Sequence, residues 1–290
     1  MRFILTTVAV LGLLGLGAAW WITRPDPLPE DALAGVTGDA DRGEAVFWAA
    51  GCASCHAAPD GDDPLILAGG QAFPSEFGTF HAPNISMDPQ HGIGDWSDLD
   101  MANAVMRGLS PSGAHYYPAF PYTGYARMQT QDMADLVAFL RTLPADATPS
   151  RDHDVGFPFN IRRAVGGWKT LYADPDWVLS DPETEQVERG RYLVEVLAHC
   201  GECHTPRNAL GGMDRSQWLR GAPNPSGKGR IPGIAPDQLD WSAGEIAYYL
   251  ESGFTPDYDS AGGSMAKVVS SFARLTAEDR ESVAAYLKAL

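Results

Sequence analysis

The four cysteines of the chain form two copies of one pattern, in which two cysteines separated by two residues precede a histidine. The copies read CASCH at Cys52–His56 and CGECH at Cys200–His204. The two thiols of such a pattern can add to the two vinyl groups of one haem, and the histidine can supply its imidazole to the iron. The sequence therefore predicts two covalently attached haems c, bound through Cys52, Cys55, Cys200 and Cys203 and ligated on one side by His56 and His204.

Two other chemistries use the same residue types. A thioredoxin-like redox pair does not require the histidine, and a single zinc site built from both cysteine pairs does not explain why a histidine follows each of them. Haem attachment uses all four cysteines, so none remains for a structural disulfide. The histidines outside the motifs at positions 81, 91, 153 and 199 have no ligand spacing for a third metal, and we expect surface or supporting roles for them.

The two motifs belong to a tandem duplication. Cys52 and Cys200 lie 148 positions apart, and Trp96 and Trp241 lie 145 positions apart. Each copy runs through a helix leading to the motif, a long Gly/Pro-rich stretch, a helix after Trp-Ser, a loop and a terminal amphipathic helix. The predicted fold class is all-α, with two tandem domains of the same kind.

Helix ends and helix faces can be predicted locally. Ser97 with Asp100, and Ser242 with Glu245, place a hydroxyl and an acidic side chain where both help the unpaired amides of a helix N-terminus. In each terminal helix, apolar residues recur at i, i+3, i+4 and i+7. We expect these residues to be core: Met133, Leu136, Val137, Leu140, Val283, Tyr286, Leu287 and Leu290.

The N-terminus carries a run without charged side chains from Phe3 to Thr23, which Arg24 ends. About 20 apolar residues span a hydrocarbon core, and Trp20 and Trp21 fit an interfacial aromatic belt. We therefore predict an uncleaved membrane anchor that holds the body on the periplasmic side of a bacterial inner membrane. Gly17–Ala19 resembles a signal-peptidase site, so a soluble periplasmic protein after cleavage is the alternative.

The charge of the chain narrows the classes of partner. The formal net charge is −16. Such a surface repels nucleic acid and anionic surfaces, so no nucleic-acid partner is expected and steering would favour a basic partner face. No paired-carboxylate constellation, nucleophile elbow or Gly-rich nucleotide fingerprint appears in the sequence.

The expected organisation has five parts: an anchor at 1–23, a linker at 24–37, a first domain at 38–146, an interdomain segment at 147–182 and a second domain at 183–290. Pro144–Pro149 and Ser180–Pro182 read as linker. The interdomain segment mixes aromatic and basic residues at Phe157–Arg163 and Trp168–Tyr172. It could clamp the two domains together, or it could contact a lipid surface or a partner.

Several short runs carry a resemblance to a known family. They lie at Phe77–Phe80, Pro83–Ser86, Gly92–Ser97, Tyr117–Tyr122, His199–Asn208 and Ala261–Ala266. Over about residues 40 to 290 the chain resembles the cytochrome c subunits of membrane-bound alcohol and gluconate dehydrogenases. The resemblance implies small helical cytochrome domains that relay electrons from a dehydrogenase subunit to the respiratory chain, with a quinone, an oxidase or another cytochrome downstream.

Two departures limit what the resemblance implies. The dehydrogenase subunits commonly carry three haem motifs, whereas this chain has two. The methionine expected in their Tyr-Pro-Ala-Met-Pro-Tyr segment is Phe120 here. The chain is more similar to stand-alone diheme members that share this substitution.

The iron ligands follow partly from the motifs and partly from the resemblance. Pro59 and Pro206, shortly after the proximal histidines, are expected to turn the chain so that a backbone carbonyl can receive each imidazole N–H, which orients the ring. For the second haem the sixth ligand is Met265, because it resembles the axial position of the family and no other methionine follows Met213.

The first haem needs another sixth ligand, because Phe120 cannot coordinate iron. We predict Met128, which ends a Tyr-x-x-Met run similar to that of the stand-alone members. The duplication aligns Met128 with Leu275, which can only pack, so core filling is the alternative. His115 would give a bis-histidine haem of lower potential, and the other candidates are Met106 and Met87.

The predicted function is electron transfer rather than catalysis. The donor would be a periplasmic or membrane dehydrogenase, and the membrane contact would be made by the N-terminal helix. A diheme enzyme, such as a peroxidase or a sulfur-compound oxidase with an open first haem, is the alternative because of Phe120. A haem-bearing assembly or anchoring module is a third hypothesis.

Overall fold

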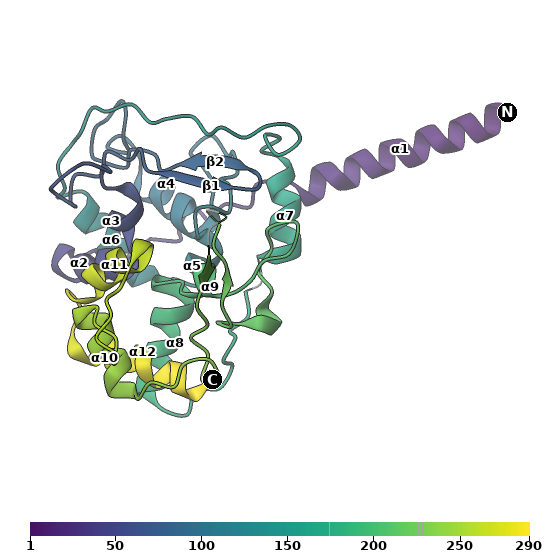
Figure 1. Ribbon diagram of the computed structural model, residues 1–290. Helices are drawn as coiled ribbons and strands as arrows, with labels where there is room; N and C mark the ends of the chain where they lie inside the picture. Colours follow the sequence, from purple (N-terminus) through teal and green to yellow (C-terminus); the bar gives the residue numbers. More distant parts are fainter. Residues whose placement is uncertain (174, 226, 228) are drawn as a thin grey trace.

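The computed structural model describes residues 1–173, 175–225, 227 and 229–290 (Figure 1). The described chain is mostly helical, as the sequence predicted, with two short antiparallel hairpins. Before and in the first copy the elements are α1 (Arg2–Ile22), α2 (Ala40–Ala49), α3 (Cys52–His56), β1 (Ala72–Ser75), β2 (Gly78–His81), α4 (Asp98–Ala102), the π-helix η1 (Asn103–Arg107), α5 (Tyr122–Tyr125) and α6 (Thr130–Leu140).

The second copy repeats this order after an interdomain helix. Its α8 and α9 correspond to α2 and α3, the pair β3–β4 to β1–β2, α10 to α4 with η1, and α12 to α6. The bounds are α7 (Ala164–Tyr172), α8 (Glu185–Tyr192), the π-helix η2 (Leu193–Leu197), α9 (Gly201–His204), η3 (Arg215–Gln217), β3 (Ala222–Pro223), β4 (Arg230–Ile231), α10 (Ala243–Ser252), α11 (Gly263–Phe272) and α12 (Ala277–Ala289).

In each copy the first helix crosses the terminal helix at a glycine. A β-carbon on Gly43 of α2 would lie 2.0 Å from the Asp135 carbonyl oxygen, and one on Gly190 of α8 would lie 1.9 Å from the Ser282 carbonyl oxygen. Only glycine allows such close approach of two helix backbones, so the same crossing is built into both copies.

The π-helix η2 explains a one-residue change in the repeat. Gly43 and Gly190 lie 147 positions apart, whereas Cys52 and Cys200 lie 148 apart. A π-helix accommodates an extra residue without breaking the helix. The extra residue in the second copy therefore falls between the helix crossing and the haem motif, where η2 is found.

The local predictions are largely confirmed. Ser97 and Ser242 both form capping boxes with the acidic residue three positions on. The apolar stripes of α6 and α12 are buried, except for Leu290, which was expected in the core but follows the last turn of α12 and is 39% exposed.

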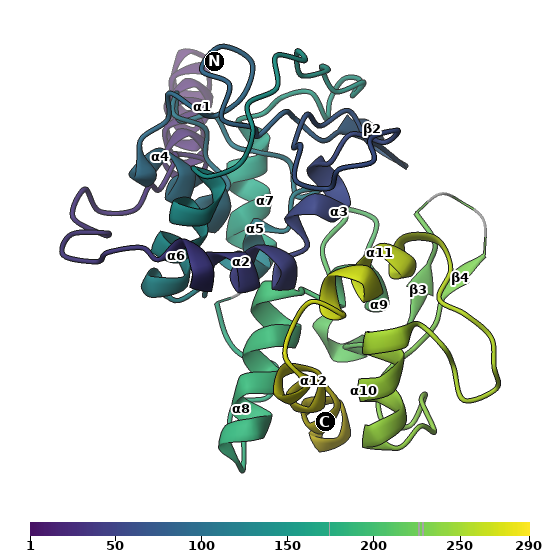
Figure 2. The ribbon, with the colours of Figure 1, turned by 90° about the vertical axis from the view of Figure 1, so that its left-hand side faces the viewer.

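The apolar N-terminal helix α1 projects from one side of the body, beside α7 (Figure 1). Figure 2 looks at the opposite side, where α2, α3 and α11 lie in front and α1 recedes behind the body. None of the residues of α1 is buried, and its length and mean hydropathy are those of a membrane span or a signal sequence. The anchor and the first haem motif therefore lie on opposite sides of the body.

Candidate haem sites

The first motif follows α2 directly, and α3 presents its histidine toward a loop of the same copy. The Nδ1 atom of His56 lies 2.9 Å from the carbonyl oxygen of Pro83. A carbonyl can only accept, so Nδ1 carries the proton and Nε2 keeps its lone pair. Burial lowers the pKa of His56, and the bond to Pro83 opposes this shift. The imidazole is thus neutral, oriented and able to coordinate iron through Nε2.

The second motif repeats this arrangement. The Nδ1 atom of His204 lies 2.8 Å from the carbonyl oxygen of Pro232, and burial again lowers the pKa of the ring. The acceptors lie 27 and 28 residues after the histidines. The prediction that a backbone carbonyl receives each imidazole N–H is confirmed. Pro83 and Pro232, the residues that supply these carbonyls, were not identified from the sequence.

The four cysteine thiols are suited to uncharged bonds. Burial raises the pKa of Cys52 and Cys200 to about 12 and that of Cys55 to about 11, and it also raises the pKa of Cys203. Thiols with raised pKa values are poor nucleophiles at neutral pH, which disfavours a redox-active pair. A thioether to a haem vinyl carries no charge and fits the same surroundings. Within the described residues, no group of three or more His, Cys, Asp or Glu side chains is placed to hold a metal ion.

The two motifs meet at the boundary between the copies. The hydroxyl of Tyr125 donates to the carbonyl oxygen of Ala50 at 2.7 Å, two residues before Cys52. The ring of Tyr125 also contacts that of His199, one residue before Cys200, edge to face at 5.4 Å. One side chain thus contacts the entrance of both haem motifs.

His199 itself is held in an uncommon conformation. Its φ angle is 40°, and Gly51, at the equivalent position of the first copy, has φ 66°. The turn into each motif requires a backbone conformation in the left-handed region, and a non-glycine residue adopts this conformation at a free-energy cost of about 1–3 kcal/mol. The histidine that replaces glycine here provides the ring that packs on Tyr125.

A lysine of the second copy also reaches the first motif. The Nζ atom of Lys267 donates to the carbonyl oxygen of Ser54 at 3.1 Å and to Oε1 of Gln71 at 2.6 Å. Lys267 lies two residues after Met265 on α11. The helix that carries Met265, the predicted sixth ligand of the second haem, is therefore hydrogen-bonded to the attachment loop of the first haem.

The predicted sixth ligands lie in different surroundings. Met128 is 3% exposed and follows α5, three residues after Tyr125. Its counterpart Leu275 is also buried, at 7% exposed. Met265 lies in the first turn of α11 and is partly buried against the core.

His115 is engaged elsewhere. Its ring is buried, and Nε2 donates to the carbonyl oxygen of Thr23 at 3.0 Å, at the end of α1. Burial lowers its pKa, and the nearby cations Lys169, Arg163 and Arg162 act in the same direction. This hydrogen bond places the ring against the end of α1.

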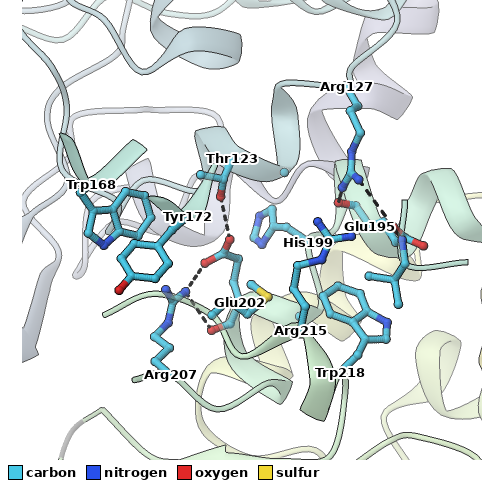
Figure 3. Close-up of a pocket in the computed structure, with 14 residues that line it drawn as sticks. Thr123, Arg127, Trp168, Tyr172, Glu195, His199, Glu202, Arg207, Arg215 and Trp218 are labelled. Atoms are coloured by element: carbon cyan, nitrogen blue, oxygen red, sulfur yellow. Dashed lines mark hydrogen bonds and ion pairs between the residues drawn. The ribbon is translucent and has the colours of Figure 1, made fainter. Parts of the chain in front are cut away.

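A small cavity lies behind the second motif, between the two copies and the interdomain segment (Figure 3). Its volume is about 60 Å³. Glu202 of the second motif accepts a hydrogen bond from Thr123 at 3.2 Å and pairs with Arg207. Charged side chains that are already paired thus line much of this cavity.

Glu195 is the most deeply buried of these acids and was not predicted from the sequence. Its carboxylate accepts a hydrogen bond from the Tyr286 hydroxyl at 2.8 Å and from the Val178 amide at 2.8 Å. It also faces Arg127 at 3.7 Å. The Tyr286 hydroxyl in turn accepts from the indole of Trp218 at 3.1 Å.

This network is specific to the second copy. The equivalent positions of the first copy are Phe47 and Phe139, which pack ring on ring at 5.1 Å. The signal was present in the duplication, because Phe47 lies 148 positions before Glu195 and Phe139 lies 147 before Tyr286. An apolar pair has thus been replaced by a buried polar pair that reaches Arg127, the residue before Met128.

The interdomain segment contacts both copies. Lys169 donates to the carbonyl oxygens of Arg107 and Gly108 in the first copy, and the indole of Trp168 donates to the carbonyl oxygen of Leu210 in the second at 2.9 Å. These contacts support the interpretation of the segment as a clamp between the domains.

Comparison with known proteins agrees with this geometry. A diheme cytochrome c-type protein of Cereibacter sphaeroides is 56% identical over 290 residues, which cover 99% of this chain and 98% of that protein. The fructose dehydrogenase cytochrome subunit of Gluconobacter japonicus is 37% identical over 86% of this chain, and the gluconate 2-dehydrogenase cytochrome c subunit of Pantoea cypripedii is 33% identical over 97%. The chain spans 52% and 65% of the length of these two subunits.

These relatives are named as cytochromes or cytochrome subunits, which are electron-transfer components rather than catalytic ones. The family model for cytochrome c matches twice, at residues 40–144 and 187–290, so each match contains one of the two haem motifs. Covalently bound haem c follows from this family, and two matches agree with two haems. The chain belongs to the cytochrome c family, as a diheme member with an electron-transfer role.

Proposed function

We propose that this cytochrome is anchored on the periplasmic side of a bacterial inner membrane and relays electrons from a dehydrogenase to the respiratory chain. The observation that carries the proposal is the meeting of the two haem motifs, each with a preset imidazole, at one boundary. Two redox centres attached to adjoining segments favour exchange of single electrons within the chain. The hydrogen bonds of Lys267, two residues after Met265, to Ser54 and Gln71 of the first copy support the same arrangement.

We infer that each iron has one histidine and one methionine ligand: His56 with Met128, and His204 with Met265. The buried position of Met128 beside Tyr125 supports the first pair, and the engagement of His115 with Thr23 removes its main competitor. Haem supplies one-electron chemistry when it is bound, and a thioether ligand raises its potential relative to a second histidine. The residues of this chain keep the imidazoles neutral and oriented.

The donor class follows from the relatives. Cytochrome subunits of fructose dehydrogenase, gluconate 2-dehydrogenase and the quinone-type alcohol dehydrogenase match most of this chain. We therefore expect a periplasmic or membrane dehydrogenase as donor and a cytochrome, oxidase or quinone as acceptor. The net charge of −16 favours a partner that presents a basic face.

The test uses membranes that contain the full haem-loaded chain. Fructose, gluconate, ethanol and nicotinate are supplied in turn without oxygen, and the haem c absorption is followed; oxygen is then added with and without an inhibitor of the terminal oxidase. We expect substrate to reduce both haems and oxygen to reoxidise them only when the oxidase is active. The matched control is the Cys200→Ser/Cys203→Ser double variant, which should interrupt the relay.

The same preparation distinguishes the enzyme alternative. A diheme peroxidase would turn over hydrogen peroxide with the purified chain alone and would show a high-spin first haem that binds added ligands. That result, without any substrate-linked reduction, would contradict the carrier function.

A further inference from the structure

The base of the anchor helix is bound in a defined site on the body. Arg163 donates through Nε to the hydroxyl of Thr23 at 2.9 Å and through a terminal nitrogen to the carbonyl oxygen of Trp20 at 2.8 Å. His115 binds the carbonyl oxygen of Thr23 from a second segment. A β-carbon on Gly166 would lie 2.5 Å from the same oxygen, so the chain packs tightly there. The direction in which α1 leaves the body is therefore fixed.

Exposed apolar side chains gather next to this base. We call residues 157–172 together with Leu210 the collar. Among the described residues that follow α1, nine large apolar side chains are exposed, and five of them belong to the collar. Phe157 is 81% exposed and Leu171 is 69% exposed, and the others are Phe159, Ile161 and Leu210. Water is a poor environment for such a cluster, which marks an interaction surface.

The charge of the collar is opposite to that of the chain. The whole chain has 37 acidic and 21 basic residues, whereas residues 155–172 contain Arg162, Arg163 and Lys169 and no acidic residue. Arg24, which is exposed, adds a fourth cation at the end of α1. Arg162, Arg163 and Lys169 are partly buried and donate hydrogen bonds within the protein, so Arg24 is the exposed cation beside the collar. Exposed aromatic and aliphatic side chains without acidic neighbours in the collar sequence, next to an exposed arginine, match the interface of a membrane with anionic headgroups.

Both ribbon views place α7 and the segment before it on the side of the body from which α1 projects (Figures 1 and 2). We propose that the collar lies in the headgroup region of the same bilayer that α1 spans, so that the body rests on the membrane rather than hanging from a flexible tether. This inference rests on the proposed function in one respect, the retention of α1 in the membrane.

The contact would set the orientation of the redox centres. With the collar against lipid, α2, α3 and α11 face away from the membrane (Figure 2). A partner that exchanges electrons through the first motif would then approach from the aqueous phase.

The test uses single cysteines in the full haem-loaded chain. Haem attachment consumes all four native thiols, so Phe159→Cys and Leu171→Cys each introduce one reactive thiol. Tyr258→Cys is the matched control, because Tyr258 is 95% exposed in the loop between α10 and α11, away from the collar. Each variant is placed in nanodiscs with anionic lipid, and its coupling rate to polyethylene glycol maleimide is divided by the rate of the same variant unfolded in urea.

We expect the normalised rates at positions 159 and 171 to be at least about tenfold lower than at 258, because a side chain in the headgroup boundary is shielded from a water-soluble polymer. Equal rates at all three positions would overturn the proposal. Protection that appears only when membrane proteins of the host are added would also overturn it and would assign the collar to a protein partner.

Two controls separate this result from failure of the proposed function. Haem absorption of each variant verifies folding, and intact mass verifies that α1 is present in the nanodisc sample. Loss of α1 by cleavage would contradict the proposal that α1 stays in the membrane. Unprotected thiols in a chain that retains α1 would contradict only the proposal that the collar lies in the headgroup region. Neither readout depends on electron transfer.

Discussion

At each haem motif a single backbone carbonyl determines which imidazole nitrogen is available to the iron. The carbonyl oxygen of Pro83 accepts a hydrogen bond from Nδ1 of His56 at 2.9 Å, and that of Pro232 accepts one from Nδ1 of His204 at 2.8 Å. Hydrogen bonding of this kind orients a ligand ring and raises its basicity. The proposed sixth ligands are less symmetric, because Met128 corresponds to Leu275 in the second copy.

Replacement of Met128 by leucine tests the first haem directly. Leucine has nearly the volume of methionine and stands at the equivalent position 275, so the fold should survive with a cost below about 1.5 kcal/mol. Loss of the thioether should lower the potential of the first haem by roughly 100 mV or more, within the ~0.8 V range that axial ligands set. A spectroelectrochemical titration measures both potentials.

Met106→Leu is the matched control, since Met106 lies in η1 and packs against the core. It should leave both potentials unchanged. If Met128→Leu also leaves them unchanged, Met128 is a packing residue and not an iron ligand.

Glu195 should influence the second haem through its charge. An anion near the motif stabilises the ferric state, so Glu195→Gln should raise that potential by tens of millivolts, since about 1.4 kcal/mol corresponds to roughly 60 mV for one electron. The reduction potential of the first haem should change less than that of the second. The same titration measures the shift, with Glu188→Gln as control because that side chain is 62% exposed. A shift of equal size in the control would show that general surface charge, not the buried network, is responsible.

At the scale of elements, each copy is organised around the crossing of its first and terminal helices. The glycines at these crossings let the two helix backbones touch, and the motif begins nine residues later in the first copy and ten residues later in the second. The haem motif is therefore held against the most closely packed part of its copy.

Gly190→Ala should destabilise the protein. Its β-carbon would collide with the Ser282 carbonyl oxygen, and forcing atoms into a packed interior costs about 1–3 kcal/mol. Gly244→Ala in α10 is the matched control, because no atom lies within 4 Å of its β-carbon and alanine favours a helix by up to about 1 kcal/mol. Urea titration of the haem-loaded chain measures both. Similar stability of the two variants would mean that α8 and α12 do not cross as closely as described.

The burial of the neutral His115 ring at the end of α1 should make the folded chain less stable in acid. Burial holds the pKa of His115 below its unfolded value of about 6.5. Between the two values the unfolded chain binds more protons than the folded one, so the free energy of unfolding should fall as the pH drops below about 6.5. Urea titrations between pH 7.5 and 5.5 measure this slope.

His115→Gln retains a hydrogen-bond donor but cannot be protonated in this range, so its pH slope should be smaller than that of the unchanged chain. An identical slope would exclude His115 as a source of the pH dependence.

At the scale of the whole molecule, the duplication, the all-α architecture, both haem motifs and both capping boxes could be predicted from the sequence. These features depend on local spacing and helix periodicity. What could not be predicted depends on contacts between distant segments. The pairing of His56 with Pro83, the pairing of His204 with Pro232 and the binding of Thr23 by His115 each join segments far apart in the sequence, and no local pattern predicts them.

The arrangement of the whole chain separates two faces. Tyr125, His199 and Lys267 join the motifs at the boundary between the copies. The collar and α1 occupy the opposite side from α3. This separation would let the membrane fix the position of the body while the redox centres remain accessible to partners.

The most direct test of the account is a count of haems and of their axial ligands in the purified full-length chain. Haem content per chain is measured by absorption, and near-infrared magnetic circular dichroism of the ferric protein detects the charge-transfer band of each methionine–iron bond. The account predicts two haems and two methionine signals, from Met128 and Met265. A single methionine signal accompanied by a high-spin, ligand-accessible haem would contradict it and would favour an enzyme with an open first iron.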